Sequence, residues 1–186
     1  MRVSREQAAE NRERIIAAAA ALFREKGYDG VGVADIMQAA DLTHGGFYGH
    51  FNSKDDLIAQ ASRAALAKSA AKWTRLADSA EPFAALVDSY LCRNHRDGSA
   101  TGCCFPALGA DAARHARPVR AAFREGLMRL VEILANVLPG ARAARRRRAL
   151  ATMAQLVGAI VLARAVDDQA LSDEILRAAR HELLAR

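Results

Sequence analysis

Two short segments with apolar residues at helical spacing lie on either side of a three-residue break, and this pattern restricts the fold more than any other feature. Within residues 33–40 the apolar side chains fall on one face of a helix of about two turns. Residues 41–43 end it, because aspartate tolerates turns and Thr43 can cap a following helix. A further helix is predicted over residues 44–50. Two helices joined so closely are typical of a helix-turn-helix, whose second helix can enter the major groove of DNA.

The rest of the sequence carries strong helix signals. Ser4 and Gln7 fit a capping box at the start of a first helix, and Gly27 is a stop signal after Lys26. The chain is 52% hydrophobic, with many alanines and only 12 glycines and 4 prolines in 186 residues, which excludes a disordered chain and disfavours an all-β fold. The sequence predicts an all-α fold, with further helices over residues 54–76, 82–95, 106–115, 118–138, 144–165 and 169–184.

The positive charge is concentrated away from the helix-turn-helix. The net charge is +6, yet residues 1–50 hold six cationic and seven acidic side chains, whereas residues 114–148 hold ten arginines and two glutamates. Charge alone would therefore assign DNA binding to the arginine run over residues 145–148. Successive helical residues point about 100° apart, so these four arginines cannot all face one groove. We interpret the run as a solvated or interface-rim face.

Cysteine usage and the apolar segments favour a cytoplasmic protein. Three cysteines cannot build the disulfide framework of a small secreted domain, and the charged N-terminal segment lacks the apolar core of a secretory signal. The most apolar stretch, residues 149–165, contains Thr152 and Gln155 and is shorter than the roughly 20 apolar residues that a bilayer requires. We interpret it as a buried helix and expect no membrane association.

The N-terminal region resembles the DNA-binding region of the TetR/AcrR family of bacterial transcription regulators. The resemblance covers about 50 residues in the family's order and spacing. The matching residues are the Ala-Leu-Phe before Gly27-Tyr28, then Val33, Asp35-Ile36, Ala40, Leu42-Thr43, Gly45, Phe47-Tyr48, His50-Phe51, Ser53-Lys54 and Leu57. The resemblance implies a helix-turn-helix DNA-binding domain over residues 1–56, including the start of the fourth helix. Residues 57–186 would then form a helical ligand-binding and dimerisation domain.

The resemblance also implies roles for individual residues of the helix-turn-helix. Phosphate and backbone contacts would fall to Tyr48, His50 and Lys54. Base edges would be approached by Thr43, His44 and Gly45, with Phe47 partly in the small core. His44 and His50 lack the spacing of a helical metal pair, so no metal site is expected. The sequence departs from the family's pattern at Val31-Gly32, Met37 and Asp41, and Gly46 and Gly49 weaken the recognition helix, which we expect to be ordered partly by docking on DNA.

The C-terminal region is expected to hold the dimer interface and a pocket for an unknown small-molecule effector. The helix over residues 144–165 carries apolar residues on two faces and needs two apolar neighbours, and the last helix adds a further apolar set, so these two helices are the expected dimer interface. A two-fold dimer predicts double-stranded DNA with a roughly palindromic operator as partner. The middle helices of the family surround a ligand, and the residues that could line such a pocket, or equally form core, are Trp73, Phe83, Val87, Tyr90, Phe105, Leu108, Phe123 and Leu127.

Alternative functions involve the cysteines or discard DNA binding. Cys103 and Cys104 could form a redox or electrophile sensor if one thiol were accessible with a lowered pKa. An enzyme using Cys103 with His95 or His115 would need a nucleophile elbow, phosphate loop or metal cluster, none of which the sequence contains. A helical interaction protein with a vestigial helix-turn-helix is a third class. We expect a repressor without catalytic residues or a cofactor, released from DNA by a ligand.

Overall fold

The computed structural model describes residues 4–185, and all regular structure in that range is helical. The first three residues of the expected DNA-binding domain, and Arg186, lie outside it. The all-α prediction is confirmed. The helices are α1 (Arg5–Lys26), α2 (Val33–Ala39), η1 (His44–Gly49), α3 (Lys54–Ala77), α4 (Pro82–Tyr90), α5 (Arg93–Asp97), η2 (Ser99–Thr101), α6 (Cys104–Arg114), α7 (Arg117–Val137), α8 (Arg142–Ala165) and α9 (Gln169–Leu184).

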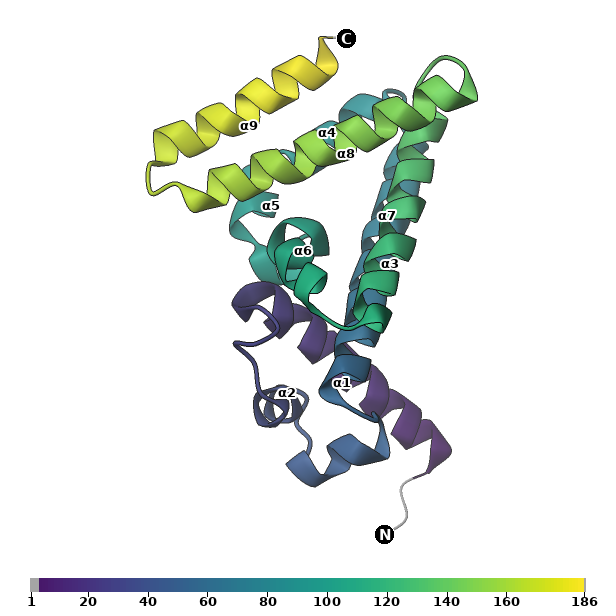
Figure 1. Cartoon of the computed structure of the whole chain (residues 1–186), viewed down its shortest axis with the longest axis vertical. Helices are drawn as coiled ribbons and strands as arrows, with labels where there is room; N and C mark the ends of the chain where they lie inside the picture. The colour runs from purple at the N-terminus through teal and green to yellow at the C-terminus, as the bar shows by residue number, and fades with distance from the viewer. Residues whose placement is uncertain (1–3, 186) are drawn as a thin grey trace.

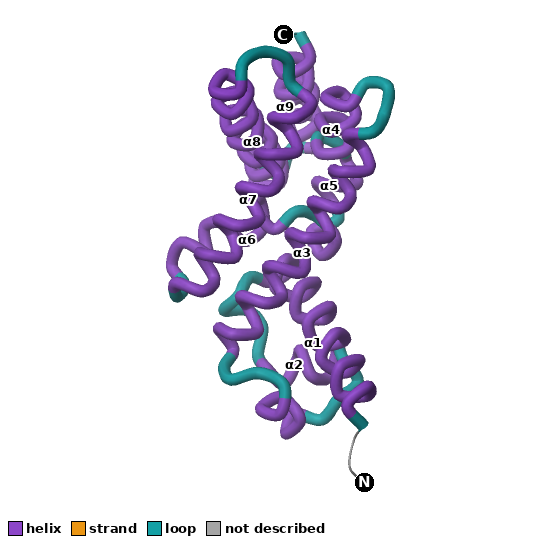
Figure 2. Tube along the Cα trace, turned by 90° about the vertical axis from the view of Figure 1, so that its right-hand side faces the viewer, coloured by secondary structure: helices purple, strands orange, loops and turns teal. Residues whose placement is uncertain are grey.

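The elements are arranged in an elongated molecule with the N-terminal helices at one end (Figure 1). Helices α1 and α2 and the short η1 helix form the lower end, and α3 rises from them with α7 packed along it. Helices α8 and α9 cross the opposite end as a pair. The view from the side shows α6 between the two ends (Figure 2). Helix α3 therefore connects the helix-turn-helix to the C-terminal body.

Local signals define most helix ends. The Ser4 hydroxyl accepts a hydrogen bond from the Gln7 amide at 3.1 Å, and Ser53 accepts one from the Asp56 amide at the start of α3. Gly27 ends α1 with φ of 76°, a conformation that glycine adopts without the steric cost of a side chain. The predicted start and end of the first helix are confirmed, although the Gln7 side chain bonds Glu10 and Asn11 instead of completing the capping box.

Several predicted helices differ from the observed ones, and the one predicted over residues 144–165 begins at Arg142. The segment over residues 82–95 is split between two helices, because the backbone leaves the helical conformation at Leu91 and is extended at Cys92. The helix predicted from Pro106 begins two residues earlier, at Cys104. The recognition segment forms a 3₁₀ helix, η1, in place of the predicted α-helix. Three glycines lower its α-helix propensity, and six residues give little cooperative stability.

Two clusters of buried side chains hold the molecule together. The lower cluster joins α1, α2, η1 and the first half of α3, and it continues into α6 and α7 through Leu108 and Phe123. The upper cluster joins the end of α3 with α4, α7, α8 and α9. Helices α3 and α7 approach closely at Gly126, where an added Cβ would lie 2.6 Å from Leu66 Cδ1. The N-terminal helices are therefore packed against the C-terminal body through a shared core.

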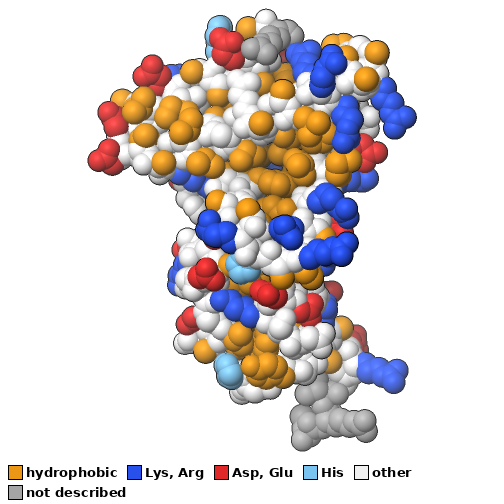
Figure 3. Space-filling model, in the orientation of Figure 1, with side chains coloured by type: hydrophobic (Ala, Val, Ile, Leu, Met, Phe, Trp, Pro, Cys, Tyr) orange, Lys and Arg blue, Asp and Glu red, His pale blue; other side chains and the backbone are white. Residues whose placement is uncertain are grey.

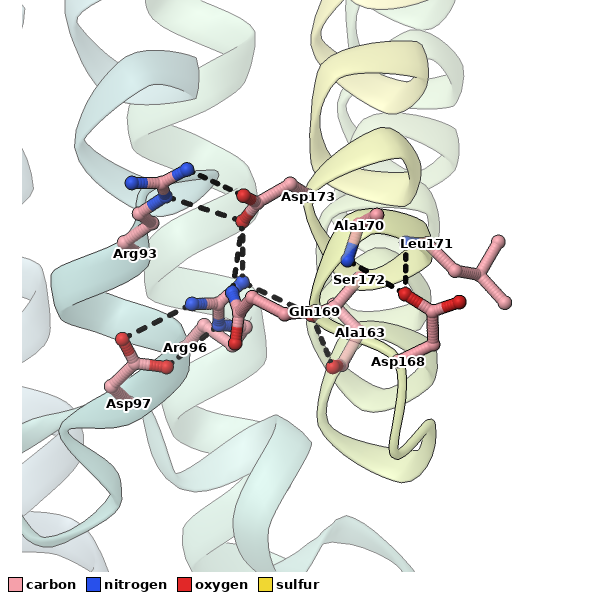
Figure 4. A network of polar contacts seen from close by, with 10 residues as sticks. All are labelled: Arg93, Arg96, Asp97, Ala163, Asp168, Gln169, Ala170, Leu171, Ser172 and Asp173. Atoms are coloured by element: carbon pink, nitrogen blue, oxygen red, sulfur yellow. Dashed lines mark hydrogen bonds and ion pairs between the residues drawn. The ribbon is translucent and has the colours of Figure 1, made fainter.

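A charged network fastens α9 to α5 (Figure 4). Arg96 is 6% exposed and donates hydrogen bonds to Asp97, to the Ser172 hydroxyl at 3.1 Å and to Asp173 at 2.7 Å. Arg93 donates to the same Asp173 carboxylate. The two guanidinium groups lower the pKa of Asp173 to about 2. A buried arginine needs such partners, so the network fixes where α9 lies.

Candidate functional site

The helix-turn-helix presents one aromatic side chain to solvent and buries its neighbour. Phe47 is 1% exposed and stacks on Phe51, with ring centroids 5.6 Å apart. Tyr48 is 71% exposed, more than any other large hydrophobic side chain in residues 4–185. Adjacent residues on a short helix cannot share a buried face, which accounts for the contrast. The buried phenylalanine thus anchors a segment whose exposed tyrosine is free to contact another molecule.

The other predicted contact residues of this segment lie on one short stretch of exposed chain. Thr43, His44 and Gly45 are exposed, and His50 is half-buried. Thr43 makes no side-chain cap, contrary to the prediction, although its backbone is extended as an N-cap requires. An added Cβ at Gly45 or at Gly49 would meet nothing within 4 Å, so the backbone there is open to a close approach.

Lys54 has a structural partner. Its ammonium group donates a 2.7 Å hydrogen bond to the backbone carbonyl of Tyr28, in the turn after α1. The side chain is half-buried and fixes the start of α3 against that turn. The Tyr28 hydroxyl in turn bonds the buried Ser62 hydroxyl at 2.8 Å. An ammonium group has three donors, so Lys54 retains capacity for a further anion.

Two arginines of α1, which the sequence did not indicate, contact the residues on either side of the recognition segment. Arg14 donates to the carbonyl of Ala40 and lies 3.5 Å from the Asp41 carboxylate. Asp41 has a left-handed backbone, with φ of 52°. Arg12 lies 5.2 Å from the Phe51 ring centroid and bonds Gln60. Their positions on an exposed, charged helix face gave no sequence signal for these contacts.

The eight predicted pocket residues do not meet in one cavity. Leu108 and Phe123 belong to the lower cluster, Trp73, Val87 and Tyr90 to the upper cluster, and Phe105 touches both. Phe83 and Leu127 pack at the edge of the upper cluster. Only Trp73 and Tyr90, among the eight, line the interior cavity of about 60 Å³ that also borders His95 and Cys103.

His95 is built into the wall of that cavity. Its Nδ1 lies 2.7 Å from the Tyr90 carbonyl, and its Nε2 accepts from the Cys103 amide at 3.0 Å. Burial lowers the pKa of the imidazole, and the nearby charges of Arg164 and Lys72 lower it further. Arg164 also donates to the carbonyls of His95 and Arg96, which ties α8 to α5.

The N-terminal region matches a known family of DNA-binding proteins. The family profile described as "Bacterial regulatory proteins, tetR family" matches residues 15–61, the helix-turn-helix with its flanking helices. The N-terminal region of the chain is therefore similar to the DNA-binding region of the TetR family. The regulator TtgR and the probable regulator ArpR, both of Pseudomonas putida, are each 40% identical over 58 residues, which is 31% of this chain. The match spans 28% of the length of each of these curated relatives.

Solved structures extend the likeness to the whole TetR fold. A TetR regulator from Chloroflexus aurantiacus is 25% identical with a TM-score of 0.80, over 97% of this chain and 95% of its own. NemR of Escherichia coli in its reduced form is 21% identical with a TM-score of 0.80, over 94% of this chain and 95% of its own. The second likeness concerns the fold alone. The C-terminal body therefore has the fold of these solved structures, as the N-terminal region does.

The last two helices of the chain leave apolar side chains uncovered. Figure 3 shows hydrophobic side chains gathered across the upper part of the molecule, over α8 and α9. Val161 is 43% and Leu162 58% exposed, and Leu150 and Leu171 are also exposed. On α8, residues 150, 151, 154, 157, 158, 161, 162 and 165 recur at helical spacing along one side, all apolar or glycine. A second face of α8 therefore lies outside the core of its own chain.

The same helix accounts for the apolar stretch of the sequence. Among the described residues, α8 is the one helix long and apolar enough to cross a membrane. Met153, Leu156 and Ile160 face the upper cluster, where α8 packs against α7 and α9. Its composition therefore reflects one face in the core and one face left for a partner, consistent with the expectation of a core helix.

The arginine run at the start of α8 does not form a single charged face. Arg148 lies over the Phe83 ring at 5.5 Å, and Arg146 bonds the Met128 sulfur at 3.5 Å. The Nε of Arg145 is buried without a hydrogen-bond partner. These directions differ as the helical spacing predicts.

The cysteines are free thiols in surroundings that disfavour the thiolate. Cys103 and Cys104 are buried, and Cys92 is half-buried. Burial raises the pKa of the Cys103 thiol and raises that of Cys104 to about 11. The Arg24 guanidinium lies 4.0 Å from the Cys104 sulfur and opposes the shift only in part. In residues 4–185 no three His, Cys, Asp or Glu side chains are grouped to hold a metal ion.

Proposed function

We propose that this chain is a sequence-specific DNA-binding transcription regulator, and that it acts in the cytoplasm as a repressor released by a small molecule. The observation that carries the proposal is the exposed Tyr48 beside the buried Phe47, on a helix-turn-helix of the TetR family. An aromatic hydroxyl held in solvent on a rigid element can bond a phosphate and fix the protein's position on DNA. No catalytic role is assigned to any residue.

The contacts with DNA follow from the exposed stretch around Tyr48. Thr43, His44 and Gly45 approach base edges, while Tyr48, His50 and Lys54 contact the DNA backbone. The bond from Lys54 to the Tyr28 carbonyl also holds the start of α3 against the turn after α1. Phe47 contributes by anchoring the segment in the core. Residues 1–50 have a net charge near zero, so the affinity for DNA comes from the local geometry of these contacts and not from the total charge.

The protein acts as a homodimer through α8 and α9. The support is the uncovered apolar stripe of α8 together with the exposed Leu171 of α9. In a two-fold dimer, the same surface of a second copy covers the α8 stripe and Leu171, and its own stripe is covered in turn. Such a dimer presents two recognition segments to successive major grooves, so the operator is roughly palindromic.

The functional division of the chain follows the expectation from the sequence. Residues 1–56 form the DNA-binding domain, and residues 57–186 bind the effector and form the dimer. Helix α3 crosses this boundary, and α6 and α7 contribute to the lower cluster, so a change in the body is transmitted to the recognition segment. An effector releases DNA only if it binds the released arrangement more tightly than the DNA-bound one.

A thiol-based response is the second candidate function. It is favoured by the whole-chain likeness to NemR, solved in a reduced form, and by Arg24 beside Cys104. The burial of both thiols opposes it, because oxidants and electrophiles react with accessible thiolates. If Cys103 is the sensor, Cys103→Ser abolishes oxidant-induced release from DNA. Unchanged release in that variant discards the thiol mechanism.

Selection of bound duplexes from a random DNA library tests the proposed function. The full chain is expected to enrich a two-fold-symmetric site, and Tyr48→Ala is expected to lose the enrichment while keeping its helix content. Met128→Ala is the control, because Met128 is an exposed apolar side chain of α7, away from the helix-turn-helix. If the folded protein enriches no sequence, or if Tyr48→Ala enriches the same site equally, the proposal fails.

A further inference from the structure

A basic cleft with an apolar floor lies between α1 and α3. It has a volume of about 680 Å³, and Thr101 of η2 and the following Gly102 also line it. Its floor consists largely of alanines from both helices. Four cations line it, Arg12, Arg24, Lys68 and Lys72, against the single carboxylate of Glu13. A cleft of this size is within the range that holds small organic ligands.

Two of the four cationic side chains are available to bind a ligand. Arg24 bonds the Ala100 carbonyl at 2.8 Å, and Arg12 is occupied by Gln60 and the Phe51 ring. Lys68 and Lys72 are exposed, and in residues 4–185 neither makes a hydrogen bond or ion pair. They lie four residues apart on α3, so both ammonium groups point to the same side of that helix.

The cleft continues into the interior cavity. Ser69, Lys72, Thr101 and Gly102 line both spaces, so the small cavity opens into the large one. The inner walls are aromatic and polar, with Trp73 at one side. At about 60 Å³ the inner cavity holds a few waters or one small polar group, whereas a cavity of about 150 Å³ is needed for a benzene ring.

Two hydroxyl groups in the inner cavity have no strong hydrogen-bond partner among residues 4–185. Tyr90 is 3% exposed, and its Oη faces the thiol of Cys103, a weak hydrogen-bonding group, with no nitrogen or oxygen partner. The Oγ of Ser89, also in the lining, is buried and unpartnered. Both nitrogens of His95 are engaged by backbone groups, so His95 cannot satisfy either hydroxyl. Unpartnered buried hydroxyls are costly, and a ligand group that bonds them recovers that cost.

We propose that the two cavities form one site for a small aromatic acid that carries a second polar group opposite its carboxylate. The carboxylate pairs with Lys68 and Lys72, the ring covers the alanine floor, and the second polar group enters the inner cavity and bonds the hydroxyls of Tyr90 and Ser89. Because α1 supplies one wall of the cleft, a bound ligand directly contacts a helix of the DNA-binding end. This consequence, release from DNA, rests on the proposed function, whereas binding itself does not.

Binding is measured on the full chain without DNA, using three matched probes. These are 4-hydroxyphenylacetate, its neutral amide, and phenylacetate, which lacks the hydroxyl. Trp73 is the single tryptophan of the chain and lines the inner cavity, so its fluorescence reports occupancy, with calorimetry as a second readout. The hydroxy acid is expected to bind about tenfold more tightly than either other probe, a difference of about 1.4 kcal/mol.

Variants separate the two ends of the site. Lys68→Gln with Lys72→Gln is expected to weaken the hydroxy acid to the level of the amide, and Lys26→Gln, an exposed lysine outside the cleft, to leave it unchanged. Tyr90→Phe is expected to remove the preference for the hydroxyl while keeping phenylacetate affinity. Within the protein the variant loses only the contact of the hydroxyl with the Cys103 thiol, which is a weak hydrogen-bonding group.

Two results would overturn the site: equal affinity for acid and amide, or no binding of any probe by the folded protein up to the solubility limit. Binding that depends on Lys68, Lys72 and Tyr90 supports the site even if no operator is selected from the DNA library. Failure of the regulator proposal and failure of this site are thus observed in separate experiments.

Discussion

His95 is held as a neutral imidazole by two backbone groups. Nε2 accepts from the Cys103 amide, so the proton must lie on Nδ1, which donates to the Tyr90 carbonyl. Protonation of Nε2 would break the bond to Cys103 and place a charge beside Lys72 and Arg164. The residue therefore joins α5 to the start of α6 only while it is uncharged.

The stability of the protein should fall in mild acid because of His95. Its pKa in the folded chain lies below the ordinary value of 6.5, so the unfolded chain binds more protons in that range. The contribution is complete above pH 6.5 and is lost as the pH falls below it. Urea unfolding between about pH 7.5 and 5.5 should give a shallower decline for His95→Gln, whose amide oxygen can still accept from Cys103.

The control for that measurement is His44→Gln, since His44 is exposed and far from the cavity in sequence and fold. A decline as steep in His95→Gln as in the natural chain would show that other groups carry the acid sensitivity.

Single residues were predictable where one neighbour decides their environment. Adjacency to Phe47 is enough to predict that Tyr48 points outward, as it does. The bond from Lys54 to Tyr28 depends on how α1 and α3 cross, which no local pattern encodes. The burial of Cys103 and Cys104 depends likewise on α6 packing against distant helices.

Among the elements, the pair α3 and α7 depends on one glycine. A Cβ at Gly126 would lie 2.6 Å from Leu66 Cδ1 and 2.9 Å from its Cβ, so Gly126→Ala must separate the helices or distort Leu66. Overpacking of this kind costs about 1–3 kcal/mol, which exceeds the helix-propensity gain of about 1 kcal/mol. Gly126→Ala is therefore expected to lower the free energy of unfolding in a urea titration.

Gly109→Ala is the matched control for this prediction. Gly109 lies in α6, and an added Cβ would meet nothing within 4 Å, so only the propensity gain remains. It should raise the free energy of unfolding by about 0.5–1 kcal/mol. A stabilising Gly126→Ala would contradict the close packing of α3 on α7.

Helix positions were predictable from sequence wherever a cap or a stop marks them. Ser4, Ser53 and Gly27 define ends that the structure reproduces. The break at Leu91 and Cys92 has no glycine or proline, so only tertiary packing specifies it. The 3₁₀ geometry of η1 was missed because apolar spacing does not distinguish a 3₁₀ helix from an α-helix over six residues.

At the scale of the whole molecule, both ends are incomplete without a partner. The exposed aromatic and glycines of η1 lie at one end, and the uncovered stripe of α8 at the other. Helices α3 and α7 connect them as a packed pair. In the proposed function the two ends act together: a dimer formed through α8 and α9 holds two recognition segments on one duplex.

Sedimentation of the protein with its selected duplex tests that claim most directly. The natural chain is expected to bind as two protomers per duplex, and Leu162→Glu to be a folded monomer with greatly weakened DNA binding. Met128→Glu, an equal change on α7 outside the stripe, should remain dimeric and bind normally. A complex of one protomer per duplex, or a Leu162→Glu variant that dimerises and binds as the natural chain does, would contradict the account.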